Sequence, residues 1–248
     1  MINLNCLNPY SVKSVRKKIS QVQFWAKMKT EIKLVSEKFC LNSKISDKSR
    51  KLYFISEHVF LRSTYNNIIS RQTSTVLYRK HIFDSLSIAT VFKSFWITDD
   101  VLNCIDFGTG GGFPGLLLSI AFPEIFISLL DSIERKVKFH TGIIRILNIK
   151  NCNSICLRGE QLGNLLVHQE KFDIITSRAV AELIDLLPLF SCITSSKGKL
   201  IIMKKIEGCE KEIDSTSIYF PDPKFKLKCL VKVDRKRSGK VIIIYKKS

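Results

Sequence analysis

The sequence predicts an α/β fold built on a mostly parallel sheet, with an antiparallel hairpin at its C-terminal end and a helical appendage at its N-terminal end. Three observations predict it. From Asp100 onward, short apolar runs alternate with helical segments, which is the pattern of βαβ units. A glycine-rich loop joins the first apolar run to the helix that follows it. In the first part of the chain, apolar residues recur at helical spacing among lysines.

The first 75 residues are predicted to form a basic helical appendage. Apolar side chains recur at helical spacing from Val12 to Phe39 and predict one long or two short amphipathic helices. A further helix is expected over residues 50–61, before a looser stretch rich in Ser, Thr and Asn. We therefore divide the chain into an appendage, residues 1–75, and an α/β domain, residues 76–248.

The α/β domain is predicted to open with a helix near His81, which Asp84 or Ser85 can cap. Seven strands follow from the short apolar runs, at residues 101–107, 125–130, 154–157, 172–176, 199–203, 225–233 and 240–245. Helices are predicted in four of the gaps, at residues 114–121, 134–147, 160–167 and 181–192. The last two strands come without a long helix before them, and they are expected to pair as an antiparallel hairpin.

Charge is concentrated at the two ends of the chain. The 248 residues hold 40 Lys and Arg against 22 Asp and Glu, a formal net charge of +18. Residues 1–51 hold 12 basic and 3 acidic residues, residues 204–248 hold 13 and 6, and the middle is close to neutral. Basic patches attract polyanions by releasing counterions, so the ends favour a nucleic-acid partner over a membrane surface. Nucleotide bias in the encoding gene is the competing explanation for the excess of lysine.

Cysteine spacing and the apolar runs exclude other classes. The eight cysteines include no C-x-x-C pair, and Cys152 and Cys156 lack the second pair that a zinc site needs, so we expect no metal. No apolar run approaches the roughly 20 residues of a membrane helix. The first residues lack a charged start before an apolar run, so we expect no secretory signal, a cytoplasmic location and free thiols.

The strongest local signal is the loop Asp-Phe-Gly-Thr-Gly-Gly-Gly-Phe-Pro-Gly, from Asp106 to Gly115. Glycines let the backbone turn sharply and approach a ligand, and the start of the next helix offers unpaired N–H groups. Asp131 ends the second predicted strand, where a carboxylate can accept both hydroxyls of an adenosine ribose. Strand, loop, helix, strand and terminal acid in this order predict a nucleoside cofactor.

Two nucleoside cofactors fit this pattern, a nicotinamide dinucleotide and S-adenosylmethionine. Asp106, just before the loop, places a negative charge close to where the sulfonium of S-adenosylmethionine would lie. The same charge would be poorly placed beside a pyrophosphate. Five βα units closed by an antiparallel hairpin also suit a methyltransferase better than a dehydrogenase. The pattern therefore favours S-adenosylmethionine.

Two motifs occur together in this chain, His-x-x-Asp-Ser at residues 81–85 and Gly-Thr-Gly-x-Gly-x-Pro-Gly at residues 108–115. With three further stretches, they resemble the bacterial small-subunit ribosomal RNA guanine-N7 methyltransferases, also called glucose-inhibited division protein B. The resemblance covers roughly residues 60–205, in the order and near the spacing of that family. It implies a class I, Rossmann-like methyltransferase fold. The further stretches are residues 129–132, 158–160 and 172–179.

The resemblance also implies the residues that bind S-adenosylmethionine. Gly108 and Phe113 would line its methionine end, with Gly110 in the same loop, and Asp131 would hold its ribose. The adenine would be flanked by two residues that follow the third strand, Gly159 and Glu160.

The remaining assignments concern the base that receives the methyl group. Arg178, after the fourth strand, would lie beside both the cofactor and the target base. The active cleft would be bordered by His81, Asp84 and Ser85, and Lys204 would face RNA. His81, Asp84 and Arg178 are thus the candidate catalytic residues by resemblance.

By the same resemblance, the enzyme methylates N7 of one guanine of 16S rRNA, at position 527 in the 530 loop, free or in a precursor of the small ribosomal subunit. It would act as a monomer without a membrane partner. Guanine N7 carries a free lone pair and needs no general base, which agrees with the lack of a convincing dyad among the four histidines. The alternatives are a methyltransferase acting on another RNA, a protein or a small molecule, a nicotinamide-dependent oxidoreductase, and an RNA-binding protein that has lost catalysis.

Overall fold

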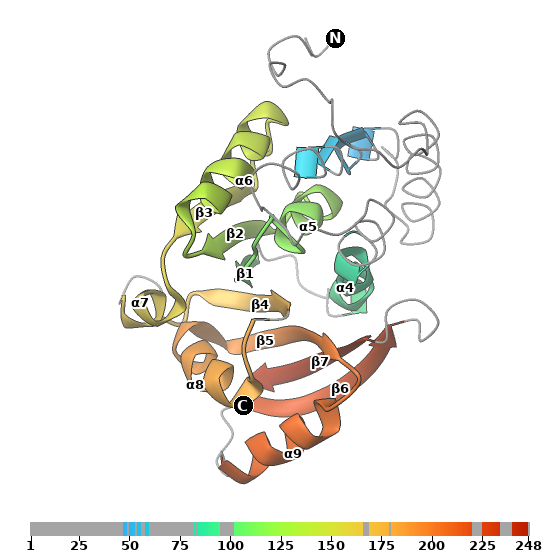
Figure 1. Ribbon diagram of the computed structural model, residues 1–248, viewed down its shortest axis with the longest axis vertical. Helices are drawn as coiled ribbons and strands as arrows, with labels where there is room; N and C mark the ends of the chain where they lie inside the picture. The colour runs from blue at the N-terminus through green and yellow to red at the C-terminus, as the bar shows by residue number, and fades with distance from the viewer. Residues whose placement is uncertain are drawn as a thin grey trace, which may run out of the picture.

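One mixed sheet of seven strands forms the centre of the molecule, in the order β3-β2-β1-β4-β5-β7-β6 (Figure 1). The first five strands pair in parallel, and β7 lies antiparallel between β5 and β6. The predicted fold class, a mostly parallel sheet closed by an antiparallel hairpin, is confirmed. The strands are β1 (Asn103–Phe107), β2 (Phe126–Asp131), β3 (Cys152–Cys156), β4 (Phe172–Arg178), β5 (Thr194–Lys205), β6 (Phe225–Val233) and β7 (Lys240–Lys247).

Helices cover both faces of this sheet (Figure 1). One face carries α4 (Asp84–Ser94), α5 (Gly115–Ala121) and α6 (Glu134–Ile146). The other carries α7 (Gly159–Asn164), α8 (Leu183–Ile193) and α9 (Cys209–Tyr219). The computed structural model describes residues 47, 48, 50–52, 54, 55, 58, 59, 82, 84–94, 102–165, 169–178, 180–219, 225–233 and 240–247.

Strand residues alternate between two hydrophobic clusters, one on each face of the sheet. In β1, Cys104 belongs to the cluster under α4, α5 and α6, whereas Ile105 and Phe107 belong to the cluster under α7, α8 and α9. The same alternation holds in β5, where Ile201 faces one cluster and Ile202 the other. Successive side chains of a strand point to opposite faces, so a sheet covered twice needs apolar residues throughout, as these strands have.

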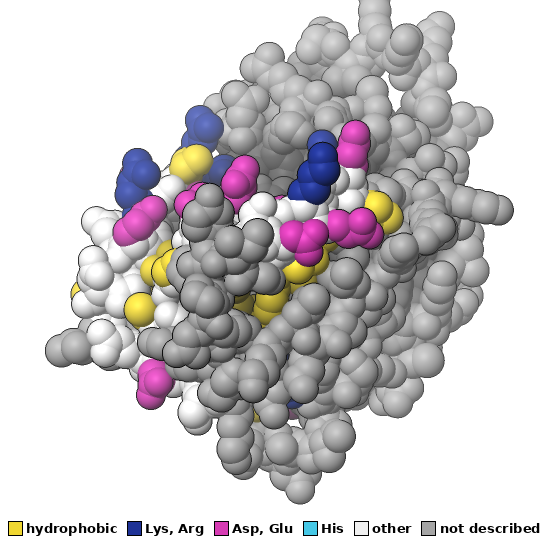
Figure 2. All heavy atoms as spheres, turned by 90° about the horizontal axis from the view of Figure 1, so that it is seen from below, with side chains coloured by type: hydrophobic (Ala, Val, Ile, Leu, Met, Phe, Trp, Pro, Cys, Tyr) yellow, Lys and Arg dark blue, Asp and Glu magenta, His cyan; other side chains and the backbone are white. Residues whose placement is uncertain are grey.

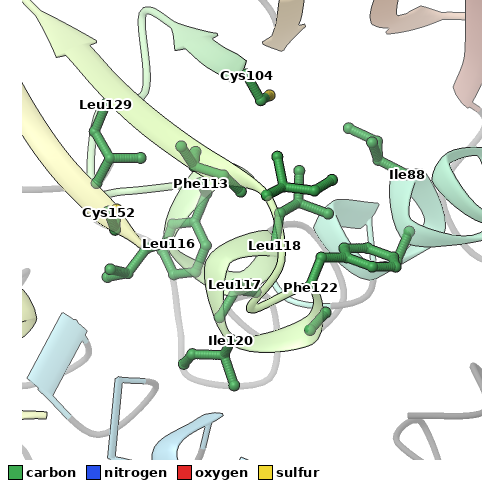
Figure 3. Close-up of a cluster of buried hydrophobic side chains, with 14 of the residues drawn as sticks. Ile88, Cys104, Phe113, Leu116, Leu117, Leu118, Ile120, Phe122, Leu129 and Cys152 are labelled. Atoms are coloured by element: carbon green, nitrogen blue, oxygen red, sulfur yellow. The ribbon is translucent and has the colours of Figure 1, made fainter. Parts of the chain in front are cut away.

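The helix α5 is the most deeply buried element of the first cluster, with every residue from Gly115 to Ala121 buried. Figure 3 shows its leucines between the strands and α4, with Ile88 of α4 and Leu129 of β2 among the residues around it. This short helix is therefore fixed on all sides, and so is the loop that leads into it.

Part of the N-terminal region packs onto the same face. The described residues between positions 47 and 59 are helical, and Leu52, Ile55 and Val59 are fully buried in the cluster that contains α4 and α5. The Lys48 ammonium donates a hydrogen bond to the carbonyl oxygen of Ala121 over 3.0 Å. The helix predicted over residues 50–61 is confirmed for these residues. The helices predicted before it lie outside the described residues, and the domain division at residue 75 stays a prediction.

The sequence prediction is wrong between β5 and β6, where no long helix was expected. The chain forms α9 there, an eleven-residue helix. Strand β5 also begins at Thr194 and not at residue 199, because Thr194 pairs with Phe172 across a register shift in β4. Among the described helices, none is long and apolar enough to cross a bilayer.

Candidate active site

The glycine loop lies at the point where the strand order of the sheet reverses. β1 has β2 on one side and β4 on the other, and the chain winds outward in opposite directions from this pair. Open α/β sheets bind their ligands outside the carboxyl ends of the strands at such a point. Gly108, Gly110 and Gly112 take φ angles of +71°, +61° and +90°, a region that favours glycine, so the predicted tight turn is present.

Asp106, the last but one residue of β1, is hydrogen-bonded to the glycine loop and to β4. Its Oδ2 accepts hydrogen bonds from the Thr109 hydroxyl at 2.6 Å and the Gly115 N–H at 2.8 Å. Its Oδ1 accepts one from the Thr176 hydroxyl of β4 at 3.0 Å. The carboxyl is fully buried, and this burial raises its pKa, against the opposing effect of the three hydrogen bonds and of Arg178. The Asp106 carboxyl therefore stabilises the conformation of the loop and is not exposed at its surface.

Asp131, at the end of β2, is also hydrogen-bonded to the glycine loop. Its Oδ2 accepts a hydrogen bond from the Gly110 N–H at 2.9 Å and lies 3.4 Å from the Lys136 ammonium. Its Oδ1 accepts one from the Ile133 N–H at 2.9 Å. The predicted ribose acceptor thus lies beside the glycine loop, and a Cβ added at Gly110 would meet no atom within 4 Å. A carboxylate next to open space suits the hydroxyls of a nucleoside, so these residues fit S-adenosylmethionine.

Arg178, the last residue of β4, lies on the opposite side of the loop. Its guanidinium carbon is 5.8 Å from the centre of the Phe113 ring. Burial lowers the pKa of the guanidinium, and the negative charges of Asp84 and Asp106 raise it. Asp84 is the first residue of α4 and is fully buried. The structure therefore brings together Arg178, Phe113 and two carboxylates, as a cluster next to the loop.

Two of the predicted cofactor residues lie one strand further away. Gly159 and Glu160 begin α7 after β3, at the same edge of the sheet. A Cβ added at Gly159 would lie 2.2 Å from Cζ of Phe107, so this glycine is required for packing against β1. Glu160 is exposed. Their predicted place beside the adenine is not tested by these contacts, and His81 lies outside the described residues.

Sequence reasoning missed Thr176 and Val180. Thr176 pairs with Asp106 from a position 70 residues away, which no local pattern can reveal. Val180 follows β4, and a Cβ added at Gly108 would lie 2.5 Å from its Cγ2. Its side chain is nevertheless 41% exposed, one of few large apolar side chains on the described surface to be so.

Lys204 has a different place from the one expected. Its ammonium donates hydrogen bonds to the carbonyl oxygen of Ala181 and, over 2.8 Å, to Oε1 of Glu212. Only 13% of its side-chain surface is exposed. The expectation that Lys204 faces RNA is therefore wrong, because its charge is used inside the protein.

No cluster of metal-binding side chains was found among the described residues. The cysteines that the structure describes are free, with Cys104, Cys152 and Cys209 buried and Cys156 and Cys192 exposed.

The model of the family described as GidB, rRNA small subunit methyltransferase G, matches residues 50–236. The chain belongs to this family. As a member of it, the protein is an S-adenosylmethionine-dependent methyltransferase, and the predicted family, methyltransferase activity and cofactor are confirmed. The nicotinamide-dependent alternative is not favoured.

Individual relatives agree with this family. The ribosomal RNA small subunit methyltransferase G of Mesoplasma florum is 35% identical over 190 residues, which are 77% of this chain and 75% of that protein. The protein of the same name from Phocaeicola vulgatus is 42% identical over 123 residues, 50% of this chain and 54% of that protein. Among solved structures, an S-adenosylmethionine-dependent methyltransferase from Aquifex aeolicus is similar in fold, with a TM-score of 0.52 at 16% identity over 70% of this chain and 93% of that one.

Proposed function

We propose that this family member methylates N7 of one guanine in 16S rRNA, in the cytoplasm and as a monomer, on free rRNA or on a precursor of the small ribosomal subunit. The names of the relatives support the rRNA substrate. The basic ends of the chain support a polyanionic partner, because the rest of the chain is close to neutral. Figure 2 shows acidic and basic side chains mixed over the described part of the face seen from below.

One observation supports the N7 chemistry more than the others. The described part of the cluster beside the glycine loop places two buried carboxyl groups, those of Asp84 and Asp106, near the guanidinium of Arg178. Guanine becomes cationic when N7 is methylated, and negative charge in a water-poor site stabilises a developing cation. N7 already has a free lone pair, so the protein has to orient the base and supply electrostatic stabilisation, without removing a proton.

The residues around the loop have separate parts in this proposal. Asp131 and the loop at Gly108 and Gly110 would hold S-adenosylmethionine, which supplies the methyl group. Gly159 and Glu160 would lie beside its adenine. Phe113 and Arg178, whose guanidinium lies over the Phe113 ring, would form the wall shared by the cofactor and the target guanine. His81 would border the same cleft from the segment before α4.

The rRNA assignment is tested by mapping N7-methylguanine directly. Purified protein, 16S rRNA and S-adenosylmethionine are incubated, and the RNA is cleaved with borohydride and aniline, which cut at this base. We expect one new cleavage site, absent when the methyl donor is omitted. The same assay on assembled small subunits compares the two forms of the substrate. An unchanged cleavage pattern on both forms refutes the assignment.

The ribose role is tested by Asp131→Ala. Loss of a charged acceptor is expected to weaken S-adenosylmethionine binding by about 1–3 kcal/mol, measured as an equilibrium dissociation constant. Asp185→Ala is the matched control, because Asp185 is exposed on α8. An Asp131→Ala affinity equal to that of the control contradicts the role.

A further inference from the structure

The side chains of Lys204, on β5, and Glu212, on α9, are hydrogen-bonded to the segment that follows β4. Oε1 of Glu212, on α9, accepts a hydrogen bond from the Leu183 N–H at 2.6 Å and another from the Lys204 ammonium at 2.8 Å. The same ammonium donates to the carbonyl oxygen of Ala181. Only 13% of the Lys204 side chain and 21% of the Glu212 side chain are exposed, so water competes weakly for these bonds.

These bonds fix one end of the short connection between β4 and α8, residues 179–182, of which the structure describes 180–182. Its other end is fixed by β4, which closes on Arg178. Between the two ends lies Val180, whose side chain rests against Gly108 of the cofactor loop. The connection therefore forms the wall of the site that faces the glycine loop. Lys204 and Glu212 are hydrogen-bonded to this connection at its α8 end.

We propose that Lys204 and Glu212 are positioning residues for methyl transfer, which set the connection after β4 against the glycine loop and so align the acceptor base with the methyl donor. This inference rests on the proposed function for the identity of the acceptor. Both side chains act on this connection through its backbone, Glu212 at the N–H of Leu183 and Lys204 at the carbonyl oxygen of Ala181.

The variant Glu212→Ala removes the acceptor of both bonds, whereas Glu212→Gln keeps an oxygen at the same place and loses only the charge. Glu210→Ala is the matched control, an exposed glutamate in the first turn of the same helix. Hydrogen exchange of the amides of residues 180–186 reports on the connection itself and requires no RNA. Single-turnover methyl transfer at saturating S-adenosylmethionine reports on alignment, and thermal unfolding reports on the fold.

We expect faster exchange at residues 180–186 in Glu212→Ala, together with a fall of about tenfold or more in the transfer rate constant, because small misplacements are costly in an aligned displacement. The donor dissociation constant should change much less. Glu212→Gln should keep most of the rate and most of the protection, and Glu210→Ala should match the wild type.

Unchanged exchange in Glu212→Ala overturns the inference, whatever the RNA assay shows. Faster exchange with an unaltered rate constant overturns it as well, as does an equal loss of rate in Glu212→Ala and Glu212→Gln. A wild-type protein that transfers no methyl group to 16S rRNA instead contradicts the proposed function, and the exchange measurement then decides the inference by itself.

Discussion

Gly115 meets its neighbours more closely than any side chain would allow. A Cβ at this position would lie 2.4 Å from Cδ2 of Leu129 and 2.7 Å from Cβ of Asp106. The glycine also donates its N–H to the Asp106 carboxylate. The close approach of α5 to the sheet therefore depends on a missing methyl group, and so does the anchoring of the cofactor loop.

We expect Gly115→Ala to lower the free energy of unfolding by about 1–3 kcal/mol, through overpacking of a buried helix. Gly142→Ala is the control, because Gly142 lies inside α6 and a Cβ there meets no atom within 4 Å. Alanine at that position should raise the free energy of unfolding by about 0.5–1 kcal/mol. Urea denaturation of both variants checks the pair, and equal effects would contradict the packing argument.

His140 is a buried histidine on α6 behind the same loop. Its Nδ1 lies 2.7 Å from the Ser154 hydroxyl, and its buried Nε2 makes no hydrogen bond within the described part of the protein. Burial lowers its pKa to about 4, while the charge of Asp131 opposes this shift and that of Lys136 adds to it. The ring is therefore neutral in the folded protein at pH 7.

This depressed pKa has a consequence for stability in acid. Between pH 6.5 and about 4 the unfolded chain binds a proton at His140 that the folded protein does not, so stability falls as the pH falls through this range. We expect the wild type to lose about 2 kcal/mol more than His140→Gln between pH 7 and pH 5. Urea denaturation at both values measures the difference. Parallel losses in the two proteins would disprove the effect.

Asn151 joins the end of α5 to the start of β2. Its amide nitrogen lies within 3.0 Å of three carbonyl oxygens, those of Ser119, Phe122 and Ile125. Asn151→Asp would place a carboxylate against these oxygens and should lower the free energy of unfolding by at least about 2 kcal/mol. Asn153→Asp, at an exposed position of β3, should change it by less than about 0.5 kcal/mol. Thermal or urea unfolding of the two variants tests this contrast.

Elements with a strong apolar pattern could be predicted from the sequence, and weakly patterned ones could not. Every strand was placed to within a few residues, because a doubly covered sheet needs unbroken apolar runs. α9 was missed, since most of its eleven residues are polar, and among those whose side chains the structure describes only Cys209 and Ile213 are buried. The early start of β5 depends on pairing between Thr194 and Phe172, which is a tertiary contact.

The candidate site, too, has residues that local sequence patterns predict and residues that only tertiary contacts explain. The glycine loop and Asp131 could be found because they follow strands at recognisable intervals. The partners of Asp106 and the internal role of Lys204 could not, since Thr176 and Glu212 reach them only after the sheet has formed. Local order along the chain predicts where a ligand binds, whereas hydrogen bonds across the sheet decide which charges remain available to it.

The distribution of charge along the chain predicts how RNA binding responds to salt. If the basic ends make about six phosphate contacts, the logarithm of the RNA association constant should fall with the logarithm of salt concentration with a slope of about −4. Binding of S-adenosylmethionine to the neutral middle of the chain should change little over the same range. Fluorescence titrations at several salt concentrations measure both, and an RNA slope near zero would contradict the electrostatic argument.

The strand order also has a consequence for biosynthesis. β1, β2 and β3 leave the ribosome before β4, so one side of β1 has unpaired peptide groups until residues 172–178 have emerged. A nascent chain that stalls before this point exposes an unpaired strand edge that can aggregate, and its Asp106 still lacks the hydrogen bond from Thr176. Completion of the catalytic centre is therefore a late event in the maturation of this polypeptide, since it waits for the C-terminal half.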